Sequence, residues 1–291
     1  MYKIPFDTTE EYLNNKDTFK NPAFIEKAFK KAQEKLSIDK IDINKFIKSR
    51  DVEKDKEYIK KKENIFEEQN TDQGKENKKI ATIAEAILHM QIEENCYLGD
   101  DVKTFRACKF DDIKNGVDEI LKIEYDNEEN LRNIIVAIDI TFSINVREKI
   151  ENIKKGIKRG RLAIIKYLKP NISNINKNKI KHTEAPKLII GIDKKNLEEV
   201  AKLWVEDKNK QLYYHPLHIM VLNEALMQAK HYKNYAKEVG QTKISKKYEE
   251  LYNIFLQEKQ KKEKLIKKIL ENPENEEKIE EDMVYQSITQ A

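Results

Sequence analysis

The chain has few of the residues that cross-link small proteins or span membranes. Only Cys96 and Cys108 are cysteines among its 291 residues, too few for a disulfide framework or a four-cysteine zinc site. No run approaches the ~18 apolar residues of a membrane span, and the first residues lack the apolar stretch of a signal peptide. We therefore expect a soluble, cytoplasmic protein without membrane contact, in which both cysteines are buried thiols.

Apolar residues are also scarce for a chain of this length. They make up 39% of the sequence and charged residues 37%, whereas globular chains typically have roughly 45–50% and 25%. Long solvated helices or loose segments must therefore accompany a core of ordinary composition.

The net charge of +4 hides a strong separation of charge along the chain. Residues 143–182 contain twelve Lys or Arg and two acids, whereas residues 271–291 contain seven acids and one Lys. A focused basic region is the electrostatic signature of a polyanion-binding protein, and it favours nucleic acid as the partner. The alternative is a solvated helix face without a partner. We expect the acidic tail to be disordered.

The pattern of apolar residues divides the chain into four parts. Residues 1–78 are predicted to form a charged helical arm that ends in the linker-like stretch TDQGKENKK (71–79), with a domain boundary near residue 78. Residues 79–206 are predicted to form an α/β core, and residues 207–270 a helical C-terminal region. The acidic tail occupies residues 271–291.

Within the core, the predicted order of elements is α–β–β–β–α–β–β–α. A buried helix (80–94) precedes strands at 104–110, 117–125 and 133–142, with turns at 111–116 and 125–130. A basic helix (145–158) ending at Gly160 then leads to strands at 161–168 and 187–192 and a helix at 194–206. We expect strand 133–142, the basic helix and strand 161–168 to form a parallel crossover.

Asp139 stands out because it is the one acid in the most apolar run, NIIVAIDITF (133–142). A carboxylate buried in a strand must be paired, hydrogen-bonded or bound to a metal. Asp118 begins the preceding strand, so the two acids could meet at one end of a sheet, and Glu85 lies in the helix upstream. Three converging oxygen ligands suit Mg²⁺. The alternative for Asp139 is a contact with backbone amides.

A helix glutamate, Gly116-Val117-Asp118 at a strand start, Asp139-Ile140-Thr141 in a buried strand and then a basic helix follow one another. This order resembles the PD-(D/E)XK nuclease-like superfamily over residues 80–193. The resemblance implies a restriction-endonuclease-like α-β-β-β-α-β core with a mixed central sheet, flanked by charged helical segments. It also implies that Glu85, Asp118 and Asp139 are catalytic acids that hold Mg²⁺ or Mn²⁺.

Thr141 occupies the position of the family's lysine, which is thought to orient or polarise the attacking water. A lysine elsewhere could replace it, and the sequence leaves several candidates open: Lys122, Lys149, Lys154 and Lys166. Thr141 would then keep only a hydrogen-bonding role.

The function implied by the resemblance is metal-dependent hydrolysis of phosphodiester bonds in nucleic acid, with DNA favoured over RNA. Two alternatives stay open: a catalytically inactive nuclease fold that binds nucleic acid, and a helical scaffold that binds a protein partner through the charged arms. The phosphate contacts would come from the basic window, chiefly from Lys154, Lys155, Lys158, Arg159, Arg161 and Lys166.

Overall fold

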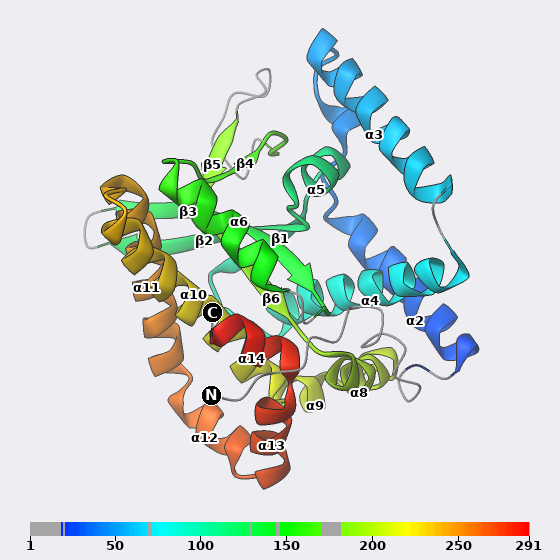
Figure 1. The fold of residues 1–291 in the computed structure, drawn as a ribbon. Coiled ribbons are helices and arrows are strands. Elements are labelled where there is room, and N and C mark those ends of the chain that lie inside the picture. Colours follow the sequence, from blue (N-terminus) through cyan, green and yellow to red (C-terminus); the bar gives the residue numbers. More distant parts are fainter. Residues whose placement is uncertain are drawn as a thin grey trace.

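The apolar run around Asp139 forms the 12-residue strand β3 (Asn130–Thr141) in the computed structural model (Figure 1). The structure describes residues 19, 21–68, 71–127, 130–143, 146–169 and 182–290. It is a mixed α/β protein, 67% helical, with a four-stranded mixed sheet. The general α/β prediction is therefore confirmed.

The main sheet has the strand order β1-β2-β3-β6. Strand β1 (Val102–Arg106) pairs antiparallel with β2 (Glu119–Asn127), and β2 pairs antiparallel with β3. Strand β6 (Lys187–Gly191) pairs parallel with β3. The helices and the 3₁₀ turn η1 that surround this sheet are α2 (Pro22–Ile38), η1 (Ile43–Lys45), α3 (Arg50–Glu68), α4 (Asp72–Glu94), α5 (Lys109–Asn115), α6 (Val146–Lys158), α8 (Lys194–Val205), α9 (Asn209–Tyr213), α10 (Leu217–Glu238), α11 (Thr242–Lys261), α12 (Glu263–Leu270), α13 (Pro273–Glu281) and α14 (Met283–Thr289).

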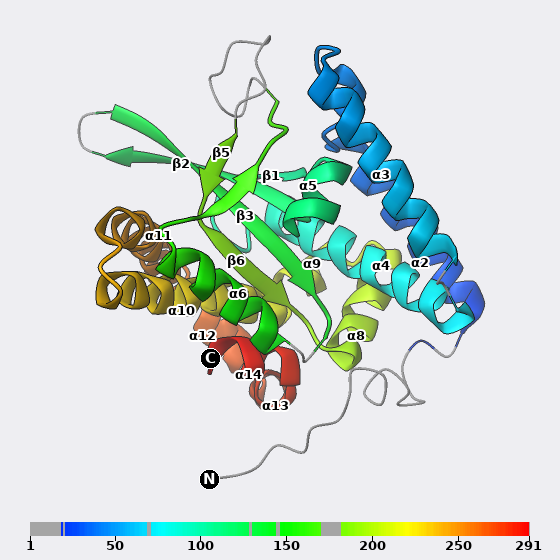
Figure 2. The ribbon, with the colours of Figure 1, turned by 45° about the horizontal axis from the view of Figure 1, so that its top comes forward.

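Helices α4 and α6 lie on opposite faces of the sheet, because side chains alternate along each strand. His89 of α4 contacts Glu119, whose cross-strand partner is Ile138. Lys149 of α6 contacts the next residue of β3, Asp139. Figure 2 shows α6 in front of the sheet, with α4 and α2 on the other side and α10 and α11 beyond β6.

Side chains from α10 and α11 close the outer edge of β6. The amide of Ile189 donates to Gln228 Oε1 at 2.9 Å, and Gln228 Nε2 donates to the Ile189 carbonyl at 2.6 Å. The amide of Gly191 donates to Glu224, and the amide of Lys187 to the Tyr248 hydroxyl. An edge strand normally leaves such groups for water or another strand, so these bonds allow β6 to be buried.

The predicted parallel partner of β3 is wrong. Residues 163–165 form the short strand β4 (Ala163–Ile165), which pairs with β5 (Thr183–Ala185) in a separate two-stranded sheet. The chain passes from α6 through these strands before β6 pairs with β3. Residues 161–168 are partly exposed, and the side chain of Ile164 is 40% exposed. Residues 188–190 are fully buried, which is the pattern of a strand covered on both faces.

Two other local predictions are also wrong. Residues 111–116 were expected as a turn, but α5 covers Lys109–Asn115 and ends at Gly116, whose φ of 60° is a left-handed helix cap. The linker predicted at 71–79 is helical, because Thr71 caps α4 and accepts from the Gly74 amide. The boundary near residue 78 thus falls within α4. The turn predicted at 125–130 lies partly outside the described residues.

The tail predicted to be disordered is helical through α13 and α14, and α14 packs on β6. Asp282 caps α14 and also accepts from the Asp193 amide at 3.0 Å. Val284 and Ile288 are buried over Gly191, where a Cβ would lie 2.4 Å from Val284 Cγ1. The composition of the tail concealed two apolar residues at helical spacing, and these dock it.

None of the helices in the described part of the chain is long and apolar enough to cross a membrane.

We expect Gln228→Ala to lower the free energy of unfolding by about 2–4 kcal/mol, because it leaves the buried amide and carbonyl of Ile189 without partners. Urea denaturation followed by circular dichroism measures this change. The control is Gln257→Ala on the exposed face of α11, which should change stability by less than about 0.5 kcal/mol. Equal effects of the two substitutions would show that the β6 edge does not depend on Gln228.

Candidate functional site

The two acids predicted as metal ligands lie opposite each other at one end of the sheet. The register of β2 and β3 pairs Glu119 with Ile138, so the preceding position places Asp118 opposite Asp139. The Asp118 amide donates to the Ile138 carbonyl at 2.9 Å, and Asp118 Oδ2 accepts from the Ile140 amide at 2.7 Å. The strands therefore bring Asp118 and Asp139 together.

Two lysines from different elements neutralise Asp139. Lys149 Nζ of α6 lies 2.6 Å from Asp139 Oδ1, and Lys187 Nζ of β6 lies 2.9 Å from Oδ2. The Lys149 side chain is 38% exposed and that of Lys187 is 15% exposed. Of the lysines that could replace the motif lysine, Lys149 is the one that contacts an acid of the pair.

Lys187 is held more firmly than Lys149. Its ammonium also donates to the Gly116 carbonyl at 2.5 Å, so it bridges the end of α5 and strand β3. Glycine is favoured at position 116 because its φ is positive, and a Cβ there would also lie 3.2 Å from Lys187 Nζ, so the lysine would have to shift slightly. The backbone conformation thus accounts for the glycine of the Gly-Val-Asp sequence.

Glu85 reaches the same end of the sheet from α4, but it is paired with an arginine. Its Oε2 lies 2.6 Å from Arg106 Nη2 of β1, and both side chains are 18% exposed. Burial raises the pKa of Glu85, and the Arg106 guanidinium opposes this rise. Arg106 Nη1 has no hydrogen-bond partner among the described residues.

The environment of Asp118 disfavours its negative charge. Burial raises its pKa well above the usual range, and the nearby carboxylates of Glu85, Asp139 and Asp112 raise it further. The hydrogen bond from the Ile140 amide acts in the opposite direction. Asp118 is therefore crowded by like charges, as acids at a cation or catalytic site often are.

Two of the predicted catalytic residues do not point to this pair. Lys122 lies four residues along β2 from Asp118, roughly 13 Å at strand spacing, and it pairs with Glu124 at 2.6 Å. The Thr141 side chain is buried, and its hydroxyl accepts from the Ser143 amide at 3.2 Å. Thr141 thus makes a local hydrogen bond at the motif position.

The predicted phosphate-binding residues separate into an accessible set and two that are engaged. Lys166 pairs with Asp55 at 2.5 Å and is only 14% exposed, so it is turned into the structure. Lys154 pairs with Glu151 and lies over the ring of Tyr235. The exposed residues at the end of α6 and just after it are Lys155, Lys158, Arg159 and Arg161.

A cavity of 260 Å³ opens beside Asp139, between α6 and the sheet. Asp139, Lys149 and Lys187 line it together with Arg161 and Tyr248. Asp139 therefore borders one hollow with the three cations Lys149, Lys187 and Arg161, an excess of positive charge that suits an anionic ligand.

The donors of the pair have the chemistry of a hard cation's ligands, since Mg²⁺ prefers one or two carboxylates and keeps several waters. A cation would also relieve the charge crowding at Asp118. In the described residues, however, no three His, Cys, Asp or Glu side chains are grouped so as to hold a metal. Both oxygens of Asp139 contact ammonium groups, so a cation there would have to displace one lysine. Of the three predicted ligands, the strands bring only Asp118 and Asp139 opposite each other, whereas Glu85 is paired with Arg106.

No family model matches the chain, and no curated protein or solved structure matches it.

Sequence reasoning missed Lys187, Arg106 and Asp112, all of which bear on the acids. A weak signal existed for Lys187, because a lysine that directly precedes the buried run LIIGI needs an acid or carbonyl partner if its ammonium is buried with the strand. Arg106 and Asp112 gave no such signal, because each occupies an ordinary polar position in its sequence.

We expect Asp118→Asn to stabilise the protein at neutral and alkaline pH. A carboxyl whose pKa is raised on folding contributes stability below its unfolded pKa and loses it as the pH rises through the folded value. Asparagine keeps an acceptor for the Ile140 amide without the charge, so the free energy of unfolding at pH 8 should rise by about 1 kcal/mol or more. Urea denaturation at pH 5 and pH 8 measures the difference, which should be smaller at pH 5.

The control is Asp101→Asn at an exposed position. Its free energy of unfolding should differ from that of the parent protein by the same amount at pH 5 and pH 8. An Asp118→Asn protein less stable than the parent at pH 8 would contradict the charge crowding inferred for Asp118.

Proposed function

We propose that the chain is a metal-dependent nuclease-like protein that hydrolyses phosphodiester bonds of nucleic acid, with DNA as the favoured substrate. The observation that carries this proposal is the Asp118–Asp139 pair at the end of the sheet, with Lys149 of the following helix on Asp139. The connectivity α4, β1, β2, β3, α6 and the parallel partner β6 supports a restriction-endonuclease-like core.

In this mechanism Asp118 and Asp139 would hold Mg²⁺ or Mn²⁺. The bound cation would lower the pKa of a water ligand and stabilise charge on the phosphate oxygens. Lys149 takes the role of the motif lysine, since its long and partly exposed side chain can leave Asp139 for an incoming phosphate. Lys187, tied to Gly116, keeps Asp139 in place. Glu85 stays with Arg106 and adds negative charge beside Asp118.

The exposed cations at and just after the end of α6 bind the phosphate backbone. Such contacts are independent of sequence and weaken with salt. Since Arg161 lines the same cavity as Asp139, a strand held by these residues passes the acid pair.

A second candidate is nucleic-acid binding without cleavage. The pairing of Asp139 with both Lys149 and Lys187 favours it, because these ammonium groups supply the positive charge that a metal would otherwise bring. Thr141 at the lysine position agrees with this candidate.

A third candidate is binding of a protein partner through the N-terminal arm. Three large apolar side chains are exposed in and around α2 and α3, namely Ile38 (70%), Ile47 (52%) and Phe66 (50%). Exposed large apolar side chains can mark an interaction site when they adjoin one another.

The decisive experiment is cleavage of plasmid and linear DNA in Mg²⁺ or Mn²⁺. We expect Asp139→Asn to lower the cleavage rate at least about 100-fold, because it removes a proposed ligand while keeping the shape of the side chain. Asp101→Asn should cleave like the parent protein. Binding without cleavage by the parent protein supports the second candidate, and neither activity at low salt supports the third.

The phosphate contacts predict a particular salt dependence. The logarithm of the association constant for duplex DNA should fall linearly with the logarithm of the salt concentration. Replacing Lys155, Lys158 and Arg159 together by Gln should make this fall less steep by about 2–3, at roughly 0.9 per lost contact. Fluorescence anisotropy between 50 and 200 mM salt measures this slope. The matched control replaces three exposed lysines of α3, Lys54, Lys60 and Lys61, by Gln. If the salt dependence falls equally in both variants, DNA binding depends on the total positive charge of the protein and not on the cations at the end of α6.

A further inference from the structure

Cations that few acids balance are concentrated where the end of α6 meets the turn between α10 and α11. Residues 154–161 contain five Lys or Arg and no acid, and residues 237–247 contain four Lys and one acid, Glu238. By contrast, helix α3 contains six Lys or Arg and seven acids. The lysines of α3 are thus balanced along their own helix, whereas those of the other two segments leave an excess of positive charge.

The two basic segments adjoin although they are far apart in the sequence. Gln241 Nε2, directly before α11, donates to the Lys158 carbonyl at 3.3 Å. A Cβ on Gly160 would lie 3.2 Å from Gln241 Oε1, so the residue that follows α6 also touches this turn. Figure 2 shows the end of α6 next to α10 and α11. Folding therefore joins residues 154–161 and 237–247 into one surface, which we call the basic corner.

The basic corner continues the cavity beside Asp139. Arg161 lines that cavity, and so does Tyr248, which directly follows the exposed Lys247 in α11. Lys247 Nζ donates to the Glu184 carbonyl of β5 at 3.3 Å, and the Tyr248 hydroxyl bonds to the backbone of β6. A row of phosphates that passes the cavity can therefore continue over the start of α11.

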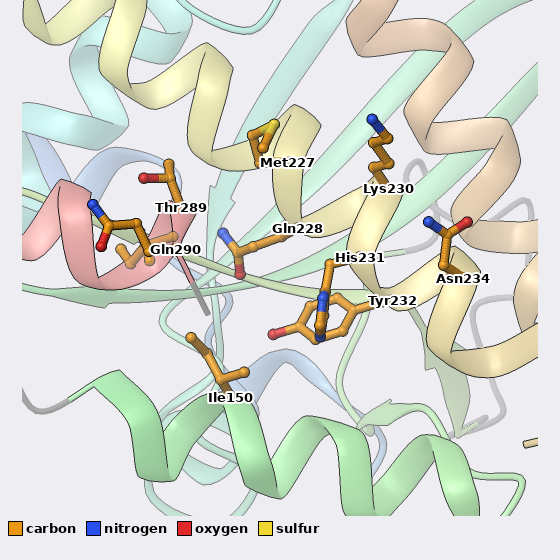
Figure 3. A pocket seen from close by; sticks show the side chains of 10 residues that line it. Ile150, Met227, Gln228, Lys230, His231, Tyr232, Asn234, Thr289 and Gln290 are labelled. Carbon is orange, nitrogen blue, oxygen red and sulfur yellow. The ribbon is translucent and has the colours of Figure 1, made fainter. Parts of the chain in front are cut away.

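The sides of α6 and α10 that face each other carry little charge. A second cavity, of 300 Å³, lies between α6, α10 and α14, and Figure 3 shows His231 and Tyr232 of α10 beside Ile150 of α6 in it. Its lining contains no acid and one cation, Lys230, whose ammonium points away from these side chains in Figure 3. The positive charge of this region thus lies on the outer surface, where an extended ligand can reach it.

The tyrosine rings of this region are covered. Lys154 Nζ lies 5.2 Å from the centre of the Tyr235 ring, and Lys233 Nζ lies 4.8 Å from that of Tyr252. Tyr248 is buried. Proteins that bind single strands stack successive bases on accessible aromatic side chains, whereas ammonium and guanidinium groups contact phosphates without touching the bases. The surface therefore favours a duplex, which keeps its bases stacked and presents two phosphate backbones.

We propose that the basic corner binds the phosphate backbone of duplex nucleic acid, and that the start of α11 supplies part of the contacts. Lys243, Lys246 and Lys247 are exposed and lie at positions i, i+3 and i+4, so they share one side of α11. This inference rests on the proposed function, because it names the form of nucleic acid that reaches the acid pair. It requires binding and does not require cleavage.

The test measures binding of the full chain in EDTA, which prevents metal-dependent cleavage, with a short duplex DNA and one of its single strands as probes. At equal salt the duplex should bind at least about 10-fold more tightly, because the strand has a lower charge density and gains no stacking. Replacing Lys243, Lys246 and Lys247 together by Gln should make the salt dependence of duplex binding less steep by about 2–3, at roughly 0.9 per lost contact. The matched control, Lys54, Lys60 and Lys61 of α3 replaced by Gln, should keep the parent's salt dependence.

An unchanged salt dependence in the α11 variant, with a melting temperature that shows it to be folded, would overturn the proposal. Equal or tighter binding of the single strand would overturn the choice of a duplex. Binding to phosphatidylserine vesicles but not to the duplex, lost in the α11 variant, would assign the basic corner to a membrane surface instead.

The same measurements separate this inference from the proposed cleavage. A parent protein that binds the duplex as expected but leaves it intact in Mg²⁺ or Mn²⁺ would refute the nuclease activity and support the basic corner. Cleavage by the parent protein, together with normal duplex binding by the α11 variant, would refute the basic corner alone.

Discussion

Asp139 places a carboxylate inside the central strand, and much of the surrounding structure serves to compensate that charge. A buried carboxylate is stable only with cations or hydrogen-bond donors around it. Lys149 ties α6 to this acid, and Lys187 ties β6 to it. Lys187 also donates to the carbonyl of Gly116, the glycine that ends α5 with a positive φ. One acid thus connects the strand, the helix after it, the parallel strand and the end of α5.

The burial of β6 imposes a second constraint that the C-terminal helices meet. A strand at the edge of a sheet leaves backbone groups unpaired, and in this protein Gln228, Glu224 and Tyr248 occupy them. Helix α14 then covers Gly191 with Val284 and Ile288. The helical C-terminal region therefore completes the α/β core and is more than an appendage to it. Its arrangement also creates the cavity that contains Tyr232 and His231.

Helix α6 borders two cavities, one beside Asp139 and one under α14. Beside Asp139 the cavity is bordered by the cations Lys149, Lys187 and Arg161. Under α14 the second cavity is lined by uncharged side chains apart from Lys230. Helix α6 takes part in both, with basic residues at its exposed end and apolar residues toward the core.

The sequence by itself determined the strand that contains Asp139, the basic helix after it and the α/β class of the core, because apolar periodicity is a local signal. It also singled out Glu85 and Asp118 as candidate acids, because their positions in the predicted helix and strand are local as well. Only the tertiary structure decided that β6 and not residues 161–168 pairs with β3, and that α14 of the tail packs on β6. It also decided which lysine meets Asp139, since Lys149 and Lys187 come from different elements and Lys122 points elsewhere. The physical reason is that pairing and charge compensation depend on contacts between residues far apart in the chain, which no local pattern contains.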